Sequence, residues 1–269
     1  MELRHCALQA FEICNPAGKV AAVQRLAPRL AALPVDCLQS FAWPEHPGRP
    51  VLPQLVEPKE VPRRSPFTAD GHAALVHSIA HIEFNAINLA LDAIWRFAGM
   101  PEAYYRDWMQ VAMEESQHFQ ALQAHLQRCG YTYGSFPAHE GLWTMCHNTR
   151  HDVVARMALV PRTLEARGLD ATPLIQAKLR KVGTPNALEA CDILDTILRE
   201  EVGHVAIGNQ WFHWLCQRDD LEPAPFYAQA ALRHAAPRPK PPFNLTERKR
   251  AGFTDTELQA LQADGCAQV

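Results

Sequence analysis

Two copies of one pattern carry the residues that could do chemistry. In each copy a single glutamate is followed, after a gap of about one helical hairpin, by the motif Glu-x-x-His. The six residues are Glu83, Glu115, His118, Glu165, Glu201 and His204. Four carboxylates and two imidazoles form a ligand set for two iron or manganese ions, because these cations accept carboxylate oxygen and imidazole nitrogen. A Glu and a His three residues apart share one helix face and can bind the same ion.

Four long helical segments must position these residues. The sequence predicts helices at about 68–98, 101–129, 142–167 and 185–216. In each segment apolar side chains recur at steps of three and four, which indicates one buried face. The candidate ligands interrupt these apolar stripes, and a buried carboxylate needs a compensating partner. The stripes contain no Lys or Arg that would neutralise four carboxylates, which favours bound cations over a buried salt-bridge network.

Local signals mark the ends of these helices. Thr68 and Asp70 are both good N-cap residues for the first helix. Pro101 is favoured at the first position of the second helix, and Gly130 is typical of a C-terminal cap. Pro185 opens the fourth helix in the same way as Pro101 opens the second.

The spacing in the first copy predicts that its two carboxylates lie at one height. Glu83 lies 17 residues before Met100, near which the chain turns, and Glu115 lies 15 residues after it. At about 1.5 Å per residue, both carboxylates lie about 25 Å from the turn. An antiparallel hairpin would therefore bring them together on facing stripes.

The second copy is less regular. The third helix is expected to end at Gly168, with a kink at Pro161 one turn before Glu165. A separate short basic helix is expected at 172–182. Glu165 would then lie near a helix end, and it is kept as a ligand because it completes the repeat.

The chain outside these helices is expected to form extensions. Residues 1–66 form an N-terminal extension, with a helix at 20–33 and a proline-rich, extended strap at 42–66. Residues 67–218 form the helical bundle, and residues 219–269 form a C-terminal extension that packs on it.

Composition narrows the class of protein. The 269 residues carry a net charge of −3, which predicts no strong attraction to nucleic acid or to an anionic membrane. The basic residues within 233–250 could serve a tRNA-sized ligand, but a solvated surface is favoured because the total charge is negative. No apolar run approaches the roughly 20 residues that a membrane span needs, and the N-terminus lacks a signal-peptide core, so we expect a cytoplasmic protein. The eight cysteines include no Cys-x-x-Cys pair, which argues against a zinc finger or a rubredoxin-type site and favours reduced, mostly buried thiols.

Other polar residues could assist. His77 and His81 are four apart and could form a zinc pair, but they point away from Glu83, and packing or a substrate-facing role is favoured. Asp152, Asp192 and Asp195 are candidate partners for the free nitrogen of a ligating histidine.

Several segments carry a family likeness. They are His81-Ile82-Glu83, Glu115-Ser116-Gln117-His118-Phe119, Glu165-Ala166-Arg167-Gly168-Leu169-Asp170 and Glu201-Val202-Gly203-His204-Val205-Ala206-Ile207-Gly208. Together they resemble the bacterial ferritin-like family catalogued as domain of unknown function 455, over about 69–253. The resemblance implies a four-helix bundle with a dinuclear metal site. It also implies a distant relation to the tRNA-modifying monooxygenase that hydroxylates an isopentenyl-adenosine, and it supports Glu165 as the third-helix ligand.

We therefore expect an all-α protein, built as a ferritin-like four-helix bundle with N- and C-terminal extensions. The favoured function is an oxygen-dependent di-iron oxidoreductase of the hydroxylase or oxidase type, with manganese or a mixed pair as alternative metals. Each copy would hold one ion, with Glu115 and Glu201 as bridges. The expected partners are dioxygen, an electron donor and a small molecule or modified nucleoside. A ferroxidase, iron-binding protein or metal-stabilised scaffold is the alternative, and a homodimer stays open.

Overall fold

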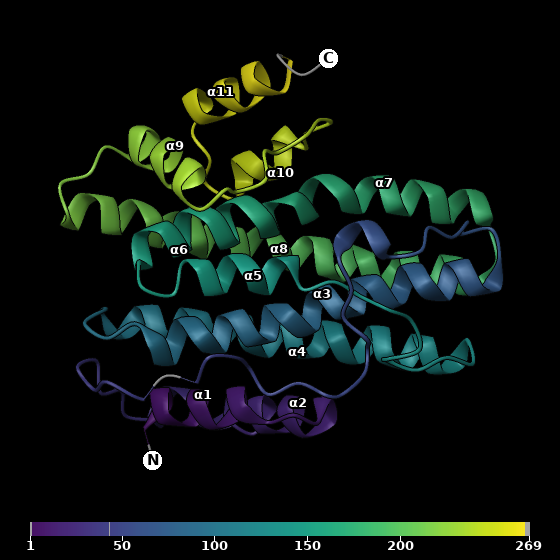
Figure 1. Ribbon diagram of the computed structural model, residues 1–269, viewed down its shortest axis with the longest axis horizontal. Coiled ribbons are helices and arrows are strands. Elements are labelled where there is room, and N and C mark those ends of the chain that lie inside the picture. Colours follow the sequence, from purple (N-terminus) through teal and green to yellow (C-terminus); the bar gives the residue numbers. More distant parts are fainter. Residues whose placement is uncertain (1, 43, 267–269) are drawn as a thin grey trace. The chain divides into compact units, whose positions relative to one another are not determined.

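The computed structural model describes residues 2–42 and 44–266, without the side chains of 264–266, and these residues form an all-α protein (Figure 1). The all-α prediction is confirmed, whereas the four-helix bundle stays a prediction. The α-helices are α1 (Leu3–Glu12), α2 (Pro16–Gln24), α3 (Ala69–Arg96), α4 (Glu102–Arg128), α5 (Gly141–Asn148), α6 (Val153–Leu159), α7 (Ala166–Val182), α8 (Pro185–Arg218), α9 (Pro223–Arg233), α10 (Leu245–Arg250) and α11 (Asp255–Cys266). A π-helical turn spans Val160–Glu165, and 3₁₀ turns span Ala27–Ala32 and Pro58–Glu60.

The chain divides into two compact units. The first unit contains residues 1–147 and 182–193, and the second contains residues 148–181 and 194–269. Helix α8 therefore begins in the first unit and continues into the second.

Helices α3 and α4 form a hairpin at the centre of the first unit. Thr68 caps α3, because its Oγ1 accepts a hydrogen bond from Gly71 N at 3.1 Å. Gly99 has a φ of +79° in the connecting turn, where glycine avoids the steric cost of the left-handed region. Pro101 is the N-cap of α4 rather than its first helical residue. Gly130 follows the last turn with a φ of +85°, as expected of a C-terminal cap.

Helices α1 and α2 pack against this hairpin. Arg4 is fully buried and donates to the carbonyl oxygens of Ile94 at 3.1 Å and Trp95 at 2.9 Å. It therefore satisfies carbonyl groups that the end of α3 would otherwise leave without a donor. Lys19 is also fully buried, and its Nζ donates to Phe11 O at 2.8 Å.

The prediction of one continuous helix over 20–33 is wrong. Asn15 caps α2, which ends at Gln24, and a 3₁₀ turn at Ala27–Ala32 replaces the predicted continuation. Pro28 lies in this turn, and without an amide hydrogen it cannot continue the α-helical hydrogen bonding.

The proline-rich segment 44–66 is extended, as predicted, and is tied to its surroundings by backbone hydrogen bonds. Gly48 N donates to Phe11 O at 2.9 Å, and Val56 N donates to Ala138 O at 2.9 Å. The strap is therefore fastened to α1 and to the loop that follows α4.

The prediction of a single third helix is also wrong. Instead of one helix over 142–167, the chain forms α5, α6, the π-helical turn and α7. Gly168 does not end a helix, and the helix predicted at 172–182 is the second half of α7. Pro161 lies in the π-helical turn, where its missing amide hydrogen prevents an ordinary α-helical bond and the backbone widens.

In the second unit the π-helical turn packs against α8. A Cβ on Gly208 would lie 2.5 Å from the Cβ of Pro161, so this approach requires glycine. Arg162 donates to Asn209 Oδ1 at 3.0 Å and forms an ion pair with Glu257. An apolar core cluster in this unit contains Ala166, Leu169, Val202, Val205, Ala251, Phe253 and Leu258.

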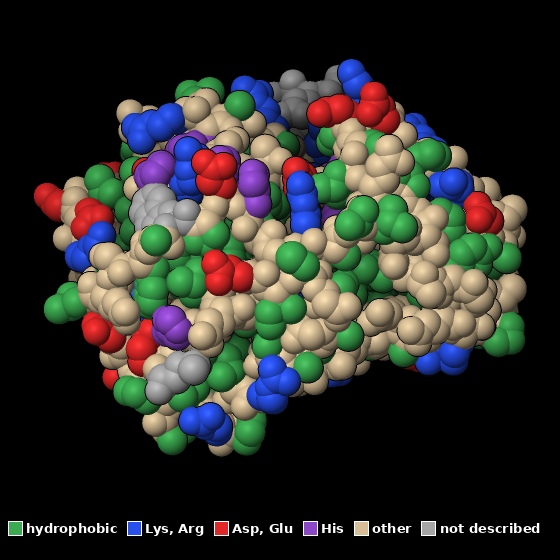
Figure 2. Space-filling view, turned by 60° about the horizontal axis from the view of Figure 1, so that its bottom comes forward, with side chains coloured by type: hydrophobic (Ala, Val, Ile, Leu, Met, Phe, Trp, Pro, Cys, Tyr) green, Lys and Arg blue, Asp and Glu red, His purple; other side chains and the backbone are tan. Residues whose placement is uncertain are grey.

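The basic residues within 233–250 are not all on a solvated surface, which corrects the prediction in part. Arg248 is buried and pairs with Asp170 at 2.6 Å, and Lys249 pairs with Asp255 at 2.7 Å. Local pairing therefore neutralises much of this positive charge. The face drawn in Figure 2 likewise shows acidic and basic side chains intermixed.

Candidate metal centre

Glu83 on α3 and Glu115 and His118 on α4 converge inside the first unit. His118 Nδ1 lies 3.2 Å from Glu83 Oε2 and 3.3 Å from Glu115 Oε2. Their ligand atoms all lie within 4.8 Å of one another, and none of the three residues is more than 6% exposed. Three of the predicted ligands therefore meet at one height, as the hairpin spacing required.

The electrostatics of this group favour a cation. Burial raises the pKa of Glu83 well above its ordinary value, and the nearby charge of Glu115 raises it further. Burial alone would lower the pKa of His118, but its two carboxylate partners outweigh this effect and raise that pKa to about 11. The carboxylates thus attract positive charge to this position, and a divalent ion could supply it in place of the imidazole proton.

Apolar side chains surround the group. Ile87 and Leu122 are fully buried on the same helix stripes as the ligands. Phe84 packs against Phe119, with ring centroids 5.3 Å apart. Burial among apolar side chains lowers the local dielectric and so strengthens the attraction of the carboxylates for a cation.

Glu201 and His204 reproduce this local geometry on α8 in the second unit. His204 Nδ1 lies 3.2 Å from Glu201 Oε2, and the two residues are 0% and 8% exposed, respectively. The corresponding distance between His118 and Glu115 is 3.3 Å. Both motifs lie on uninterrupted α-helix, so the same three-residue spacing produces the same pairing of atoms.

Glu165 is the last residue of the π-helical turn and is 7% exposed. Gly168 follows one turn later, and a Cβ there would lie 3.6 Å from Glu201 Cγ. Positions three apart share a helix face, so the face that carries Glu165 packs on α8 at the level of Glu201. The expectation that Glu165 lies near a helix end is wrong, because the helical segment continues through α7.

Two of the predicted partners for a ligating histidine have other roles. Asp152 caps α6 by accepting from Ala155 N at 2.9 Å. Asp195 accepts from Gln176 Nε2 at 2.5 Å. Both carboxylates therefore stabilise helices of the second unit.

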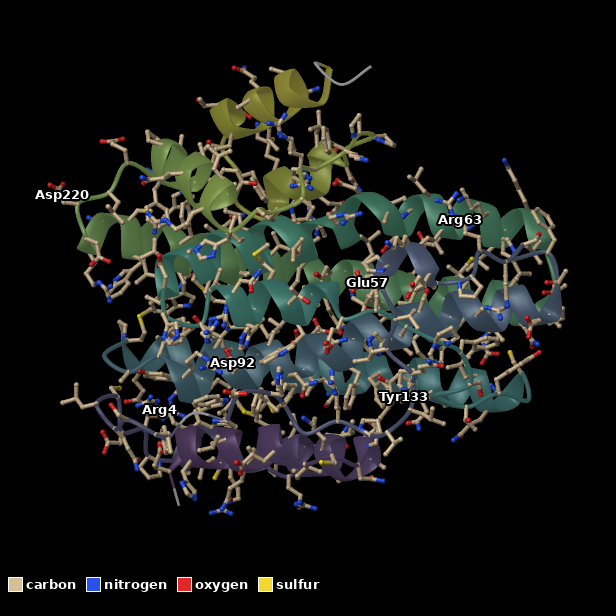
Figure 3. All side chains as sticks on the ribbon, viewed as in Figure 1. Arg4, Glu57, Arg63, Asp92, Tyr133 and Asp220 are labelled. Carbon is tan, nitrogen blue, oxygen red and sulfur yellow. The ribbon has the colours of Figure 1, made fainter. Side chains whose placement is uncertain are left out.

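Sequence reasoning missed a cavity of about 560 Å³ in the first unit, between the proline-rich strap and one side of α3. His81, Phe84, Asn85 and Asn88 line it from α3. Tyr133, which is labelled in Figure 3, lines it from the loop after α4. His81 Nδ1 lies 2.8 Å from Tyr133 Oη. The sequence shows that the lining residues of α3 are three or four positions apart and so share one helix face. It does not show that the loop after α4 and the proline-rich strap lie against this face.

The fold and site define an all-α protein with buried carboxylate and histidine clusters that could hold metal ions. The chain belongs to the family described as "Protein of unknown function (DUF455)", whose family model matches residues 12–259. It is similar to an "Uncharacterized protein" of Haemophilus influenzae, with 49% identity over 216 residues that cover 78% of this chain and 74% of the relative. No solved structure matches it. Among the described residues, no helix has the length and apolar character needed to cross a bilayer.

Proposed function

We propose that the protein is an oxygen-dependent di-iron oxidoreductase of the hydroxylase or oxidase type. The buried group of Glu83, Glu115 and His118 carries this proposal, because two carboxylates and an imidazole in apolar surroundings are a donor set that suits iron. The same local geometry at Glu201 and His204 supports a second ion. Manganese accepts the same donors, so a di-manganese or mixed centre belongs to the same proposal.

The six predicted residues would hold the two ions, three for each. In this proposal the ligands are Glu83, Glu115 and His118 for one ion, and Glu165, Glu201 and His204 for the other. Two ferrous ions held by these residues would supply electrons for oxidation of a substrate by dioxygen. Ile87 and Leu122 would exclude water, so that the oxidant reacts with the substrate rather than with solvent.

The cavity beside α3 is the proposed substrate site. Its volume of about 560 Å³ suits a small molecule. Phe84 and Tyr133 offer aromatic rings and Asn85 offers an amide, a combination that suits a planar, hydrogen-bonding substrate such as a modified nucleoside. Phe84 also packs against Phe119, the residue after His118, so one aromatic wall adjoins both the cavity and the metal ligands.

The test is anaerobic titration with ferrous iron, followed by admission of oxygen and analysis of added nucleosides. We expect about two ions per chain and iron-dependent oxygen consumption. Glu115→Ala and Glu201→Ala should remove the oxygen consumption, whereas Glu114→Ala, at the neighbouring position, should retain it. A folded wild-type chain that binds only traces of iron or manganese would refute the proposal. Oxygen uptake that oxidises only iron would instead assign the ferroxidase function.

A further inference from the structure

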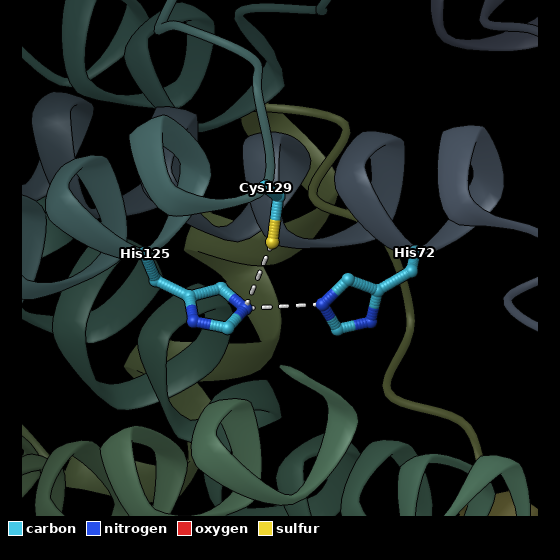
Figure 4. A group of neighbouring side chains, drawn as sticks. All are labelled: His72, His125 and Cys129. Atoms are coloured by element: carbon cyan, nitrogen blue, oxygen red, sulfur yellow. Dashed lines mark hydrogen bonds between the residues drawn. The ribbon is translucent and has the colours of Figure 1, made fainter. Parts of the chain in front are cut away.

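A second group of metal-binding side chains lies at the open end of the α3–α4 hairpin (Figure 4). His72 lies near the start of α3, and His125 and Cys129 lie at the end of α4. His125 Nε2 lies 3.0 Å from His72 Nε2 and 3.6 Å from Cys129 Sγ. This group is separate from the carboxylates, because His118 lies about two helical turns, or about 10 Å, before His125 on α4.

These distances match a tetrahedral zinc site. With Zn–N bonds of about 2.0 Å and Zn–S bonds of about 2.3 Å, tetrahedral angles place two nitrogens about 3.3 Å apart, and a nitrogen and a sulfur about 3.5 Å apart. The three donor atoms here already lie within 4.8 Å of one another. Thiolate and imidazole are also the donors that zinc prefers, whereas the carboxylate-rich group suits iron or manganese.

Glu189 on α8 orients His125. Its Oε2 lies 3.1 Å from His125 Nδ1, and its other oxygen accepts from Arg128. A carboxylate at Nδ1 holds the proton on that nitrogen and leaves the Nε2 lone pair directed at His72 and Cys129.

Hydrogen bonds between these side chains do not satisfy all of their polar atoms. Two Nε2 atoms that face one another can share only one hydrogen bond. His72 Nδ1 is buried and has no hydrogen-bond partner among the described residues. Cys129 is partly exposed and the Glu189 side chain is 41% exposed, so an ion can reach the group from solvent.

We propose that His72, His125 and Cys129 bind one zinc ion, with a fourth position open to water. The α3–α4 hairpin is closed at one end by the turn at Gly99, and the ion would join its other end. Glu83 and Glu115 lie between these two ends. The zinc ion would therefore fix the register of α3 against α4, the helices on which these two residues lie. The proposal of a zinc site does not depend on the proposed oxidoreductase function.

Cobalt(II) is the probe that separates the two kinds of site, because thiolate coordination produces a near-ultraviolet charge-transfer band that carboxylate ligands do not. The full-length, metal-free chain should develop this band up to one equivalent of cobalt and lose it when zinc is added. The band should be absent in Cys129→Ser. It should be retained in Cys6→Ser, a buried thiol on α1, and in Glu115→Ala.

A band that survives in Cys129→Ser, or a folded wild-type chain without the band, would overturn the proposal. If circular dichroism shows that Cys129→Ser is unfolded, His72→Gln provides the same test through zinc competition with a chromophoric chelator. Glu189→Gln should weaken zinc binding by about 10–100-fold, the usual effect of removing a carboxylate that orients a ligating histidine. The exposed control Glu222→Gln should leave zinc affinity unchanged, and equal affinities in these two variants also count against the site.

Discussion

The two copies of the Glu-x-x-His motif have the same local geometry but depend on different backbones. In the first unit, α3 and α4 are uninterrupted, and Glu83 meets His118 across a simple hairpin. In the second unit, α8 is equally regular, but Glu165 comes from a π-helical turn. The difference lies in the lone glutamate, because the Glu-x-x-His pairs themselves are built alike.

The comparison teaches that the second copy depends more on packing from distant parts of the chain. The π-helical turn is held against α8 by the close approach of Pro161 to Gly208, and Arg162 ties it to Glu257 near the C-terminus. The first copy requires only the register of one hairpin, which helix geometry sets locally. Changes in the C-terminal elements should therefore affect the second copy and spare the first.

The largest expected effect is the loss of metal from the first copy when the Glu115 carboxylate is removed. Glu115→Ala should abolish iron binding at the first copy, because His118 and Glu83 alone leave too few charged donors. The neighbouring Glu114→Ala should bind iron like the wild type. Iron stoichiometry by elemental analysis measures the difference, and identical stoichiometry in the two variants would contradict the ligand assignment.

Arg162→Met should destabilise the second unit by about 2 kcal/mol, because Glu257 would keep only the partly exposed His213 and the Thr254 amide as partners among the described residues. The control is Arg199→Met, since that arginine lies on α8 with its side chain 66% exposed, and we expect a change below about 0.5 kcal/mol. Urea denaturation compares the two. Equal free energies of unfolding would show that Arg162 does not hold the π-helical turn.

Gly208→Ala and Gly203→Ala form a matched pair on α8. A Cβ at position 208 would collide with Pro161, so we expect a loss of about 2 kcal/mol. A Cβ at position 203 would meet no atom of the described residues within 4 Å, so helix propensity predicts a gain of up to about 1 kcal/mol. Thermal unfolding of both variants measures the difference, and a neutral Gly208→Ala would remove the claim of close packing.

The last expected effect is a change in how the stability of the first unit depends on pH. Burial lowers the pKa of Lys19 from 10.5 to about 7, so between these values the unfolded chain binds more protons than the folded one. Stability should therefore rise with pH across this window, by up to about 1.4 kcal/mol per pH unit. Lys19→Met should remove this contribution. Urea denaturation at pH 7, 8 and 9 measures both slopes, and equal slopes would show that Lys19 stays protonated.

Much of the first copy was predictable from the sequence. The cap at Thr68, the turn after α3 and the residue counts to Glu83 and Glu115 depend on the regular rise of a helix, so local signals were enough. The course of the third helix was not predictable. The sequence alone indicates only a simple kink at Pro161, because the packing of Pro161 against Gly208 is a tertiary contact. Likewise, His72 and His125 lie 53 positions apart, and no local pattern connects them.

The sequence by itself determined the all-α class, the ligand types and their three-residue spacing, since hydrophobic periodicity and helix geometry act over short distances. Only the tertiary structure decided how Glu165 is presented, which residues line the cavity and where a second group of side chains that could bind a metal forms. Each of these depends on contacts between segments far apart in the chain. Such contacts are selected by packing and burial of the whole unit rather than by the conformational preference of any one segment.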